Sequence, residues 1–272
     1  MSTPDERLAF VQTKIARAEK HFDDLKRSVQ AFLATQPYVV ATKRDSTTRR
    51  LIYYLASVQP TPPELASIAG DVIQNLRSAL DHLAYQLFLV GPGAQVGDGH
   101  RIYFPIDDNA LAFKSNLPNR TKGMRPDAIS ALLVVEPYQG GKGHSLWIFS
   151  KLSNTDKHRS LIAVGSAFRS VNIGPQLTGM LQKSSDQASG GGIKIPKLDF
   201  FVKPADRMFP LKQGDELFID MPDAEPNPNI QFRFEVSLSE PKVVEGEPLI
   251  ETIQMLFDEM RAITPIFRPC LA

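Results

Sequence analysis

Two short stretches of this sequence combine the side chains that acid–base chemistry needs. One runs from Asn75 to His82 and the other from Asn154 to Arg159, and each contains an aspartate, a histidine and an arginine. Because the stretches are predicted to lie on separate helices, the fold can bring them to one cleft. The candidate catalytic residues are Arg77, His82 and His158, and the candidate supporting residues are Asn75, Ser78, Asp81, Asp156 and Arg159.

Two imidazoles and two guanidinium groups around one cleft suit the cleavage of a phosphodiester. Histidine exchanges protons near neutral pH, so that His82 could take a proton while His158 gives one. Arg77 would stabilise the charge that develops on the phosphate in the transition state. This chemistry requires no cofactor, and we predict none.

The same residues allow a second interpretation, a metal-dependent hydrolase. Asp81 and Asp156 supply two carboxylates, and His82 and His158 supply two imidazoles, which suffice for Zn, Mn or Fe. Asp81 and His82 are adjacent, however, and diverge by about 100° on a helix. The usual helical spacings of metal ligands, His-x₃-His or Glu-x₂-His, do not occur in either stretch. The spacing therefore favours chemistry without a metal.

A third interpretation is a protein without enzymatic activity. Asp156, Arg77 and Arg159 can form buried ion pairs that lock two helices together, and His82 can donate to a carbonyl. The two stretches would then stabilise the fold or line a pocket for a ligand or a protein partner.

The stretch Arg77-Ser78-Ala79-Leu80-Asp81-His82 resembles the R-x₄-H motif of HEPN-type helical domains. The polar residue after the arginine, Ser78, also fits that motif. Many HEPN domains are metal-independent ribonucleases of toxin and antiphage systems, and the arginine and histidine of two protomers meet at a dimer interface. The resemblance implies that Arg77 and His82 are catalytic, that Asn75 and Ser78 are their neighbours, that RNA is the substrate and that the protein is a homodimer.

Both stretches together, NLRSALDHL and LSNTDKHRSL, also resemble a widespread group of uncharacterised bacterial proteins, from which no function transfers. The chain differs from a plain HEPN domain in two places. A β-hairpin is predicted between its first two helices, and about 80 residues of β structure are predicted after its later helices.

The first stretch lies in a long predicted helix, about residues 63–90. Between Asp71 and Val90 the apolar residues occupy one continuous arc of the helix and the polar residues the other. The polar arc contains no lysine or glutamate, the residues typical of a solvated helix face. Its side chains suit a polar cleft or a buried network better than open water. One stripe along this arc consists of Asp71, Asn75, Ser78, His82 and Tyr85.

The second stretch lies in a helix that we expect to run from His144 to about residue 168. Residues 154–159 interrupt its apolar pattern, so the helix would turn a polar surface inward there. Further helices are predicted over 5–34, 108–116, 125–134 and 248–263, the last packing back on the first.

The β structure is predicted in two blocks. Tyr38–Thr42 and Leu51–Val58 would form a hairpin. Beyond residue 168 an antiparallel meander is expected, with a flexible loop at Ser184–Gly192. Its predicted strands are Phe168–Ile173, Ile193–Lys203, Met208–Leu211, Glu216–Asp220 and Ile230–Leu238.

These elements predict an α+β fold, a bundle of four to five helices with an inserted β-hairpin and a C-terminal antiparallel sheet. We expect one domain over residues 1–272. Its parts would be a mainly helical part (1–168) with the hairpin at about 38–58, a β part (169–246) and a closing helix (247–264).

The composition excludes several classes of protein. The net charge of +1 gives no overall attraction to nucleic acid or to a membrane surface, so RNA would be bound by local groups. The single cysteine, Cys270, excludes an intramolecular disulfide and a cysteine-based zinc cluster. The amino terminus has no hydrophobic region typical of a signal peptide, and no apolar run reaches the roughly 20 residues of a membrane span. We therefore predict a cytoplasmic protein.

Overall fold

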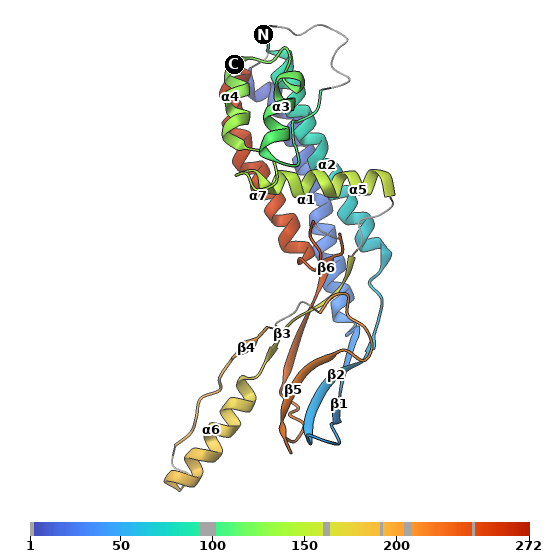
Figure 1. The fold of residues 1–272 in the computed structure, drawn as a ribbon, viewed down its shortest axis with the longest axis vertical. Helices are drawn as coiled ribbons and strands as arrows, with labels where there is room; N and C mark the ends of the chain where they lie inside the picture. The colour runs from blue at the N-terminus through green and yellow to red at the C-terminus, as the bar shows by residue number, and fades with distance from the viewer. Residues whose placement is uncertain (1–2, 93–101, 160–163, 191–192, 204–207, 241–242) are drawn as a thin grey trace.

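A computed structural model describes residues 3–92, 102–159, 164–190, 193–203, 208–240 and 243–272 of the chain. For residues 155–159 and Ser189 it describes the backbone alone. The fold is α+β, as predicted. The molecule is elongated, with a helical part at one end and two small sheets at the other (Figure 1). None of the helices in the described part is long and apolar enough to cross a membrane.

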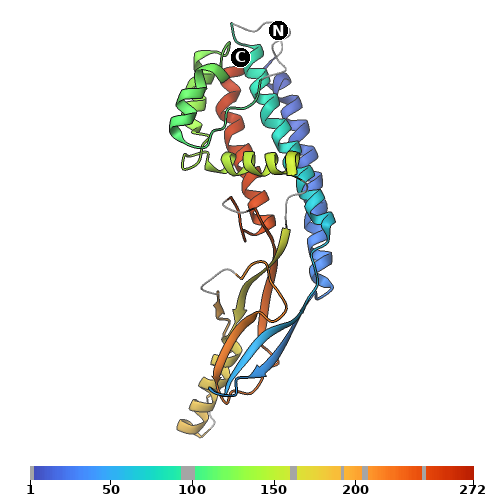
Figure 2. The ribbon, with the colours of Figure 1, turned by 45° about the vertical axis from the view of Figure 1, so that its right-hand side comes forward.

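Two long helices, α1 (Pro4–Ala34) and α2 (Pro63–Leu89), lie side by side and form the axis of the helical part (Figure 2). Helix α1 begins with a capping box, in which the side chains of Thr3 and Glu6 each accept a hydrogen bond from the other's backbone N–H. The buried positions of both helices follow the apolar stripes of the sequence, and they form one core with the other helices of the bundle.

Three shorter helices and a closing helix complete the bundle. They are α3 (Ala110–Arg120), α4 (Pro126–Val135), α5 (His144–Arg159) and α7 (Leu249–Phe267), and a short 3₁₀ helix, Arg268–Leu271, ends the chain. Helix α5 crosses the long helices, whereas α7 packs along them (Figure 1). Asp5 and Arg268 form an ion pair of 2.7 Å that joins the two ends of the chain. The expected packing of the last helix on the first is confirmed, since the rings of Phe22 on α1 and Phe257 on α7 lie 5.3 Å apart, centroid to centroid.

Helix α7 extends past the predicted end at Ile263 and contains Pro265. A proline within a helix leaves the carbonyl four residues earlier without its donor. The helix continues nevertheless, because Phe267 is fully buried and its ring lies edge-on to Phe104. Thr264 also supports this turn, since its hydroxyl donates to the carbonyl of Met260 at 2.7 Å.

Six strands form two antiparallel sheets of three strands each in the described part of the chain. In the first sheet the order is β1-β2-β5, and in the second it is β4-β3-β6. The hairpin is confirmed, but it is not a separate insertion, because β5 from the C-terminal part pairs with its second strand. The strands are β1 (Tyr38–Arg44), β2 (Arg50–Val58), β3 (Val164–Asn172), β4 (Phe201–Val202), β5 (Glu216–Pro222) and β6 (Gln231–Leu238).

Four predicted elements of the C-terminal half are wrong. The helix from His144 does not reach residue 168, because α5 ends at Arg159 and β3 already begins at Val164. The expected strand over Ile193–Lys203 is reduced to the two residues of β4, and Met208–Leu211 is not a strand. Where a flexible loop was expected, helix α6 (Gly174–Ser189) occupies most of the segment.

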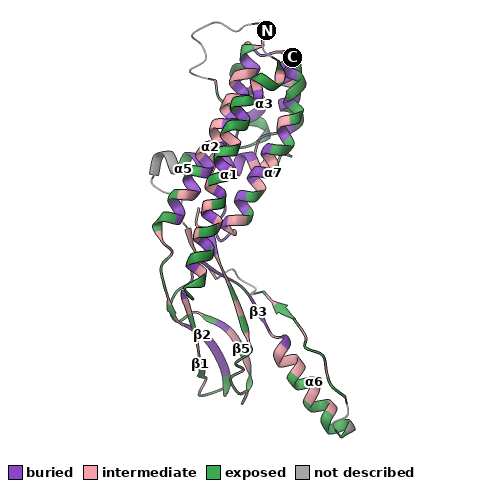
Figure 3. Cartoon of the chain, turned by 180° about the vertical axis from the view of Figure 1, so that it is seen from behind, coloured by how far each residue is buried: buried purple, intermediate pink, exposed green. Residues whose placement is uncertain are grey.

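Helix α6 projects from the sheets and packs against the extended chain that follows it (Figure 3). Gln182 holds the two together, since its amide donates to the carbonyl of Ile193 and accepts from the N–H of Ile195. The first glycine of the predicted loop, Gly190, ends the helix, because it adopts the left-handed conformation of a C-cap with φ +67°.

Candidate functional site

Arg77 and Asp81 form a two-point ion pair on α2. The guanidinium Nε lies 3.1 Å from Oδ2 of Asp81, and Nη2 lies 3.1 Å from Oδ1. The spacing of four residues places the two side chains on one helix face. Their side chains are 14% and 21% exposed, so the pair is largely shielded from water. The guanidinium of Arg77 is therefore held in one orientation by Asp81.

Asp81 also fastens the chain that follows α2. Its Oδ1 accepts a hydrogen bond of 3.1 Å from the backbone N–H of Phe104, whose ring is buried in the core. The carboxylate thus joins α2 to the extended segment 102–106, and both of its oxygens are engaged.

His82 lies on the opposite border of the polar face of α2. Its half-buried ring stacks on Phe10 of α1, with the ring centroids 6.2 Å apart and the planes at 27°. His82 follows Arg77 by five residues. At about 100° per residue, their side chains therefore differ in direction by about 140° around the helix axis. Arg77 is directed toward the 102–106 segment and His82 toward α1, and the two residues flank the face between them.

Half-buried polar residues occupy the face between Arg77 and His82. Ser78 and Tyr85 lie near its middle, and Leu89, 40% exposed, lies at its C-terminal end. Asn75 lies beside His82 and donates to the carbonyl of Asp71, 2.8 Å away on the preceding turn. The predicted residues of the first stretch therefore share one partly exposed surface of α2.

The second predicted stretch lies on the last turns of α5. The side chains of Asp156, His158 and Arg159 fall outside the described part, so their position relative to His82 stays a prediction. The backbone brings the two helices together one turn earlier, where the amide of Gln74 donates to the carbonyl of Ser153 at 3.2 Å.

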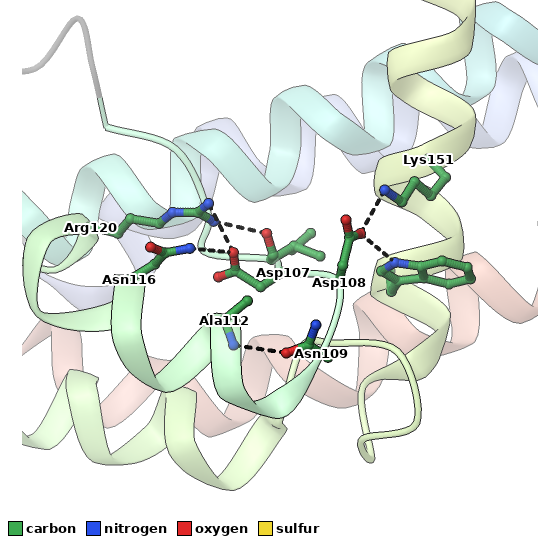
Figure 4. Close-up of polar contacts among 9 residues, drawn as sticks. Asp107, Asp108, Asn109, Ala112, Asn116, Arg120 and Lys151 are labelled. Atoms are coloured by element: carbon green, nitrogen blue, oxygen red, sulfur yellow. Dashed lines mark hydrogen bonds and ion pairs between the residues drawn. The ribbon is translucent and has the colours of Figure 1, made fainter.

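A polar cluster that sequence reasoning missed surrounds the segment Asp107–Asn109 (Figure 4). Asp107 is 6% exposed in its side chain, and its Oδ1 accepts from Asn116 at 2.8 Å and from Arg120 at 3.0 Å. Its other oxygen is buried and has no hydrogen-bond partner among the described residues. Arg120 also donates to the carbonyl of Ile106, so this buried carboxylate anchors α3 to the 102–106 segment.

Asp108 links the same segment to α5. Its Oδ1 accepts a hydrogen bond of 2.9 Å from the indole of Trp147 and lies 2.6 Å from the Nζ of Lys151. The bond from Lys151, followed by that from Trp147, lowers the pKa of the Asp108 carboxyl below its usual value. Trp147 itself is buried in the core, with 7% of its surface exposed. The one signal in the sequence was the pair of aspartates directly after Tyr103-Phe104-Pro105-Ile106.

Among the described side chains, no group of three or more histidine, cysteine, aspartate or glutamate residues could hold a metal ion. The predicted ligands Asp156 and His158 lie outside that set. Comparisons of the chain with protein-family models, with curated proteins and with solved structures find no match.

Proposed function

We propose that this protein is a HEPN-like, metal-independent endoribonuclease that acts as a homodimer on RNA in the cytoplasm. The observation that carries the proposal is the placement of Arg77 and His82 on the two borders of one partly exposed polar face of α2. Two copies that pack through this face would bring the histidine of one copy near the arginine of the other.

The chemistry follows from the two side chains. The imidazole of His82 would take the proton of the RNA 2′-hydroxyl, which attacks the phosphorus and expels the 5′ oxygen. A second imidazole, from the partner copy or from His158, would give a proton to that leaving oxygen. The guanidinium of Arg77, oriented by Asp81, would stabilise the charge on the phosphate. Ser78 and Asn75 lie close enough along the helix to support His82, and Asp156 and Arg159 would complete the site from α5.

Cleavage of RNA in the presence of EDTA tests this proposal. We expect the purified protein to cleave mixed RNA, and we expect His82→Ala and Arg77→Gln each to lose cleavage by a factor of about 10² or more. His21→Ala is the matched control, because His21 lies half-buried on α1, outside the polar face of α2, and should retain full activity. Cleavage that requires an added metal would instead favour the metal-dependent hydrolase.

A second candidate is a binding protein without enzymatic activity, and one observation favours it. Arg77, Asp81 and Phe104 form a connected set of bonds that fastens a loop to α2, which a purely structural role would also require. In that case Arg77→Gln would lower the melting temperature. Neither the wild type nor any variant would cleave RNA.

A further inference from the structure

A cleft lies where the helical part meets the sheets, away from the polar face of α2. Its volume is about 470 Å³, within the range of about 300–1,000 Å³ that small-molecule sites occupy. One wall comes from the end of α1 and the start of β1, and the other from β3 and β6. Its apolar lining consists of Leu33, Pro37, Tyr38, Phe232 and Phe234.

Two arginines, Arg169 and Arg233, share this lining. Phe168 pairs with Phe234 and Ser170 with Arg233, so that Arg169 is the extra residue of a bulge in β3. Bulges redirect a side chain and are frequent beside functional sites. Arg169, the bulged residue, thus joins Arg233 in the lining of the cleft.

The two guanidinium groups differ in their partners. Arg169 lies 3.2 Å from Glu251 and 3.4 Å from Glu235, so its charge is balanced by neighbouring carboxylates. Arg233 is exposed and rests on the ring of Phe201, with its guanidinium carbon 3.8 Å from the ring centroid. In the described part of the chain we find no ion pair to Arg233. Of the two arginines in the lining, Arg233 is therefore the one whose charge no carboxylate of the described residues balances.

The aromatic walls are fixed by their own contacts. The ring centroids of Tyr38 and Phe234 lie 4.4 Å apart. The hydroxyl of Tyr38 donates a hydrogen bond of 2.7 Å to the Oγ of Ser166. Because these rings are held in place, a planar group can stack on them at little cost in side-chain order.

We propose that this cleft binds a ligand with one aromatic ring and one phosphate, of the class of a nucleoside monophosphate. The ring stacks on the aromatic wall formed by Tyr38, Phe232 and Phe234, and the phosphate accepts hydrogen bonds from the planar fork of Arg233. The site goes beyond the ribonuclease proposal and does not depend on it, because none of its residues belongs to α2 or α5.

Isothermal titration of the full-length protein with adenosine 5′-monophosphate tests the site. We expect binding that is tighter than that of adenosine or of inorganic phosphate alone, and that weakens as salt is raised. Arg233→Gln should weaken it by roughly tenfold or more, since a hydrogen bond to a charged group is lost. Arg233→Lys keeps the charge but loses the planar fork of the guanidinium. Its affinity should lie between those of the wild type and Arg233→Gln.

Two controls separate this site from other effects. Arg17→Gln removes the same charge from an exposed position on α1 and should bind as the wild type does. His82→Ala should also bind normally, even if it abolishes RNA cleavage. The proposal is overturned by an absence of binding at millimolar nucleotide, by equal affinity for inorganic phosphate, or by unchanged affinity in Arg233→Gln with an unaltered melting temperature.

Discussion

The ion pair of Arg77 and Asp81 has a structural role, and we propose for Arg77 a second role in a reaction. Asp81 engages the guanidinium at two points and also accepts from the N–H of Phe104. The same contacts that fasten the 102–106 segment would therefore orient Arg77 toward a phosphate. The two roles separate by measurement, because a structural role changes stability whereas a catalytic role changes a rate.

We expect Asp81→Asn to lower the stability of the protein. The amide removes one charge from a pair that is only 14% and 21% exposed, and it leaves Arg77 without its counter-ion. A loss of about 1–3 kcal/mol follows, which corresponds to a fall in melting temperature of roughly 2–4 °C per kcal/mol. Asp71→Asn, at an exposed position of the same helix, should melt within about 0.5 kcal/mol of the wild type. Equal melting temperatures of the two variants would contradict a stabilising role of the Arg77–Asp81 ion pair.

The link between Asp108 and α5 should depend on pH in a defined direction. Because Lys151 and Trp147 lower the pKa of this carboxyl in the folded protein, its contribution to stability is present above the unfolded value of about 3.9. That contribution is lost as the pH falls through the lower, folded value. Thermal melts of the wild type and Asp108→Asn should therefore differ near pH 6, and the difference should shrink as the pH falls below the unfolded value of about 3.9. A difference that persists unchanged to low pH would argue against the link.

At the scale of elements, α7 shows how tertiary packing overrides a local signal. The predicted end of this helix was Ile263, and proline is a local signal that ends helices, yet α7 continues past Pro265 to Phe267, whose ring is completely buried. In α6, where a loop was predicted, Gln182 likewise forms hydrogen bonds with the neighbouring chain at Ile193 and Ile195.

Alanine substitutions beyond Pro265 test the extension of α7. Phe267→Ala should cost about 3–5 kcal/mol in the free energy of unfolding, because it opens a cavity against Phe104 in the core. Ile266→Ala is the matched control, since Ile266 is 40% exposed and should cost far less. Urea unfolding measures both, and similar costs for the two variants would show that the chain beyond Pro265 does not pack as described.

The sequence predicted those elements whose signals are local. The periodic helices α1 and α2 and the hairpin β1–β2 were recognised within a few residues of their bounds. The pairing of β5 with the hairpin was not predicted. These strands are far apart in the sequence, and their pairing depends on tertiary structure. The partners of Asp107 and Asp108 were missed for the same reason, since Arg120 and Lys151 lie on other elements.

At the scale of the whole molecule, the helical part and the sheets lie end to end (Figures 1 and 2). A compact chain of 272 residues would have a radius of gyration of about 18–19 Å. We expect small-angle X-ray scattering of the monomer to give a clearly larger value. Because the protein is proposed to dimerise, light scattering across a dilution series identifies the concentration at which the monomer is measured. A monomer value of about 19 Å would contradict the extended arrangement.

The most direct test of the central claim is the rate at which the protein cleaves a short RNA in EDTA, compared with the same oligonucleotide lacking the 2′-hydroxyls. The account predicts that the RNA is cleaved, that the deoxy version is not, and that His82→Ala reduces the rate by about 10²–10⁴ relative to His21→Ala. An intact RNA at every protein concentration, or full activity in His82→Ala, would contradict it.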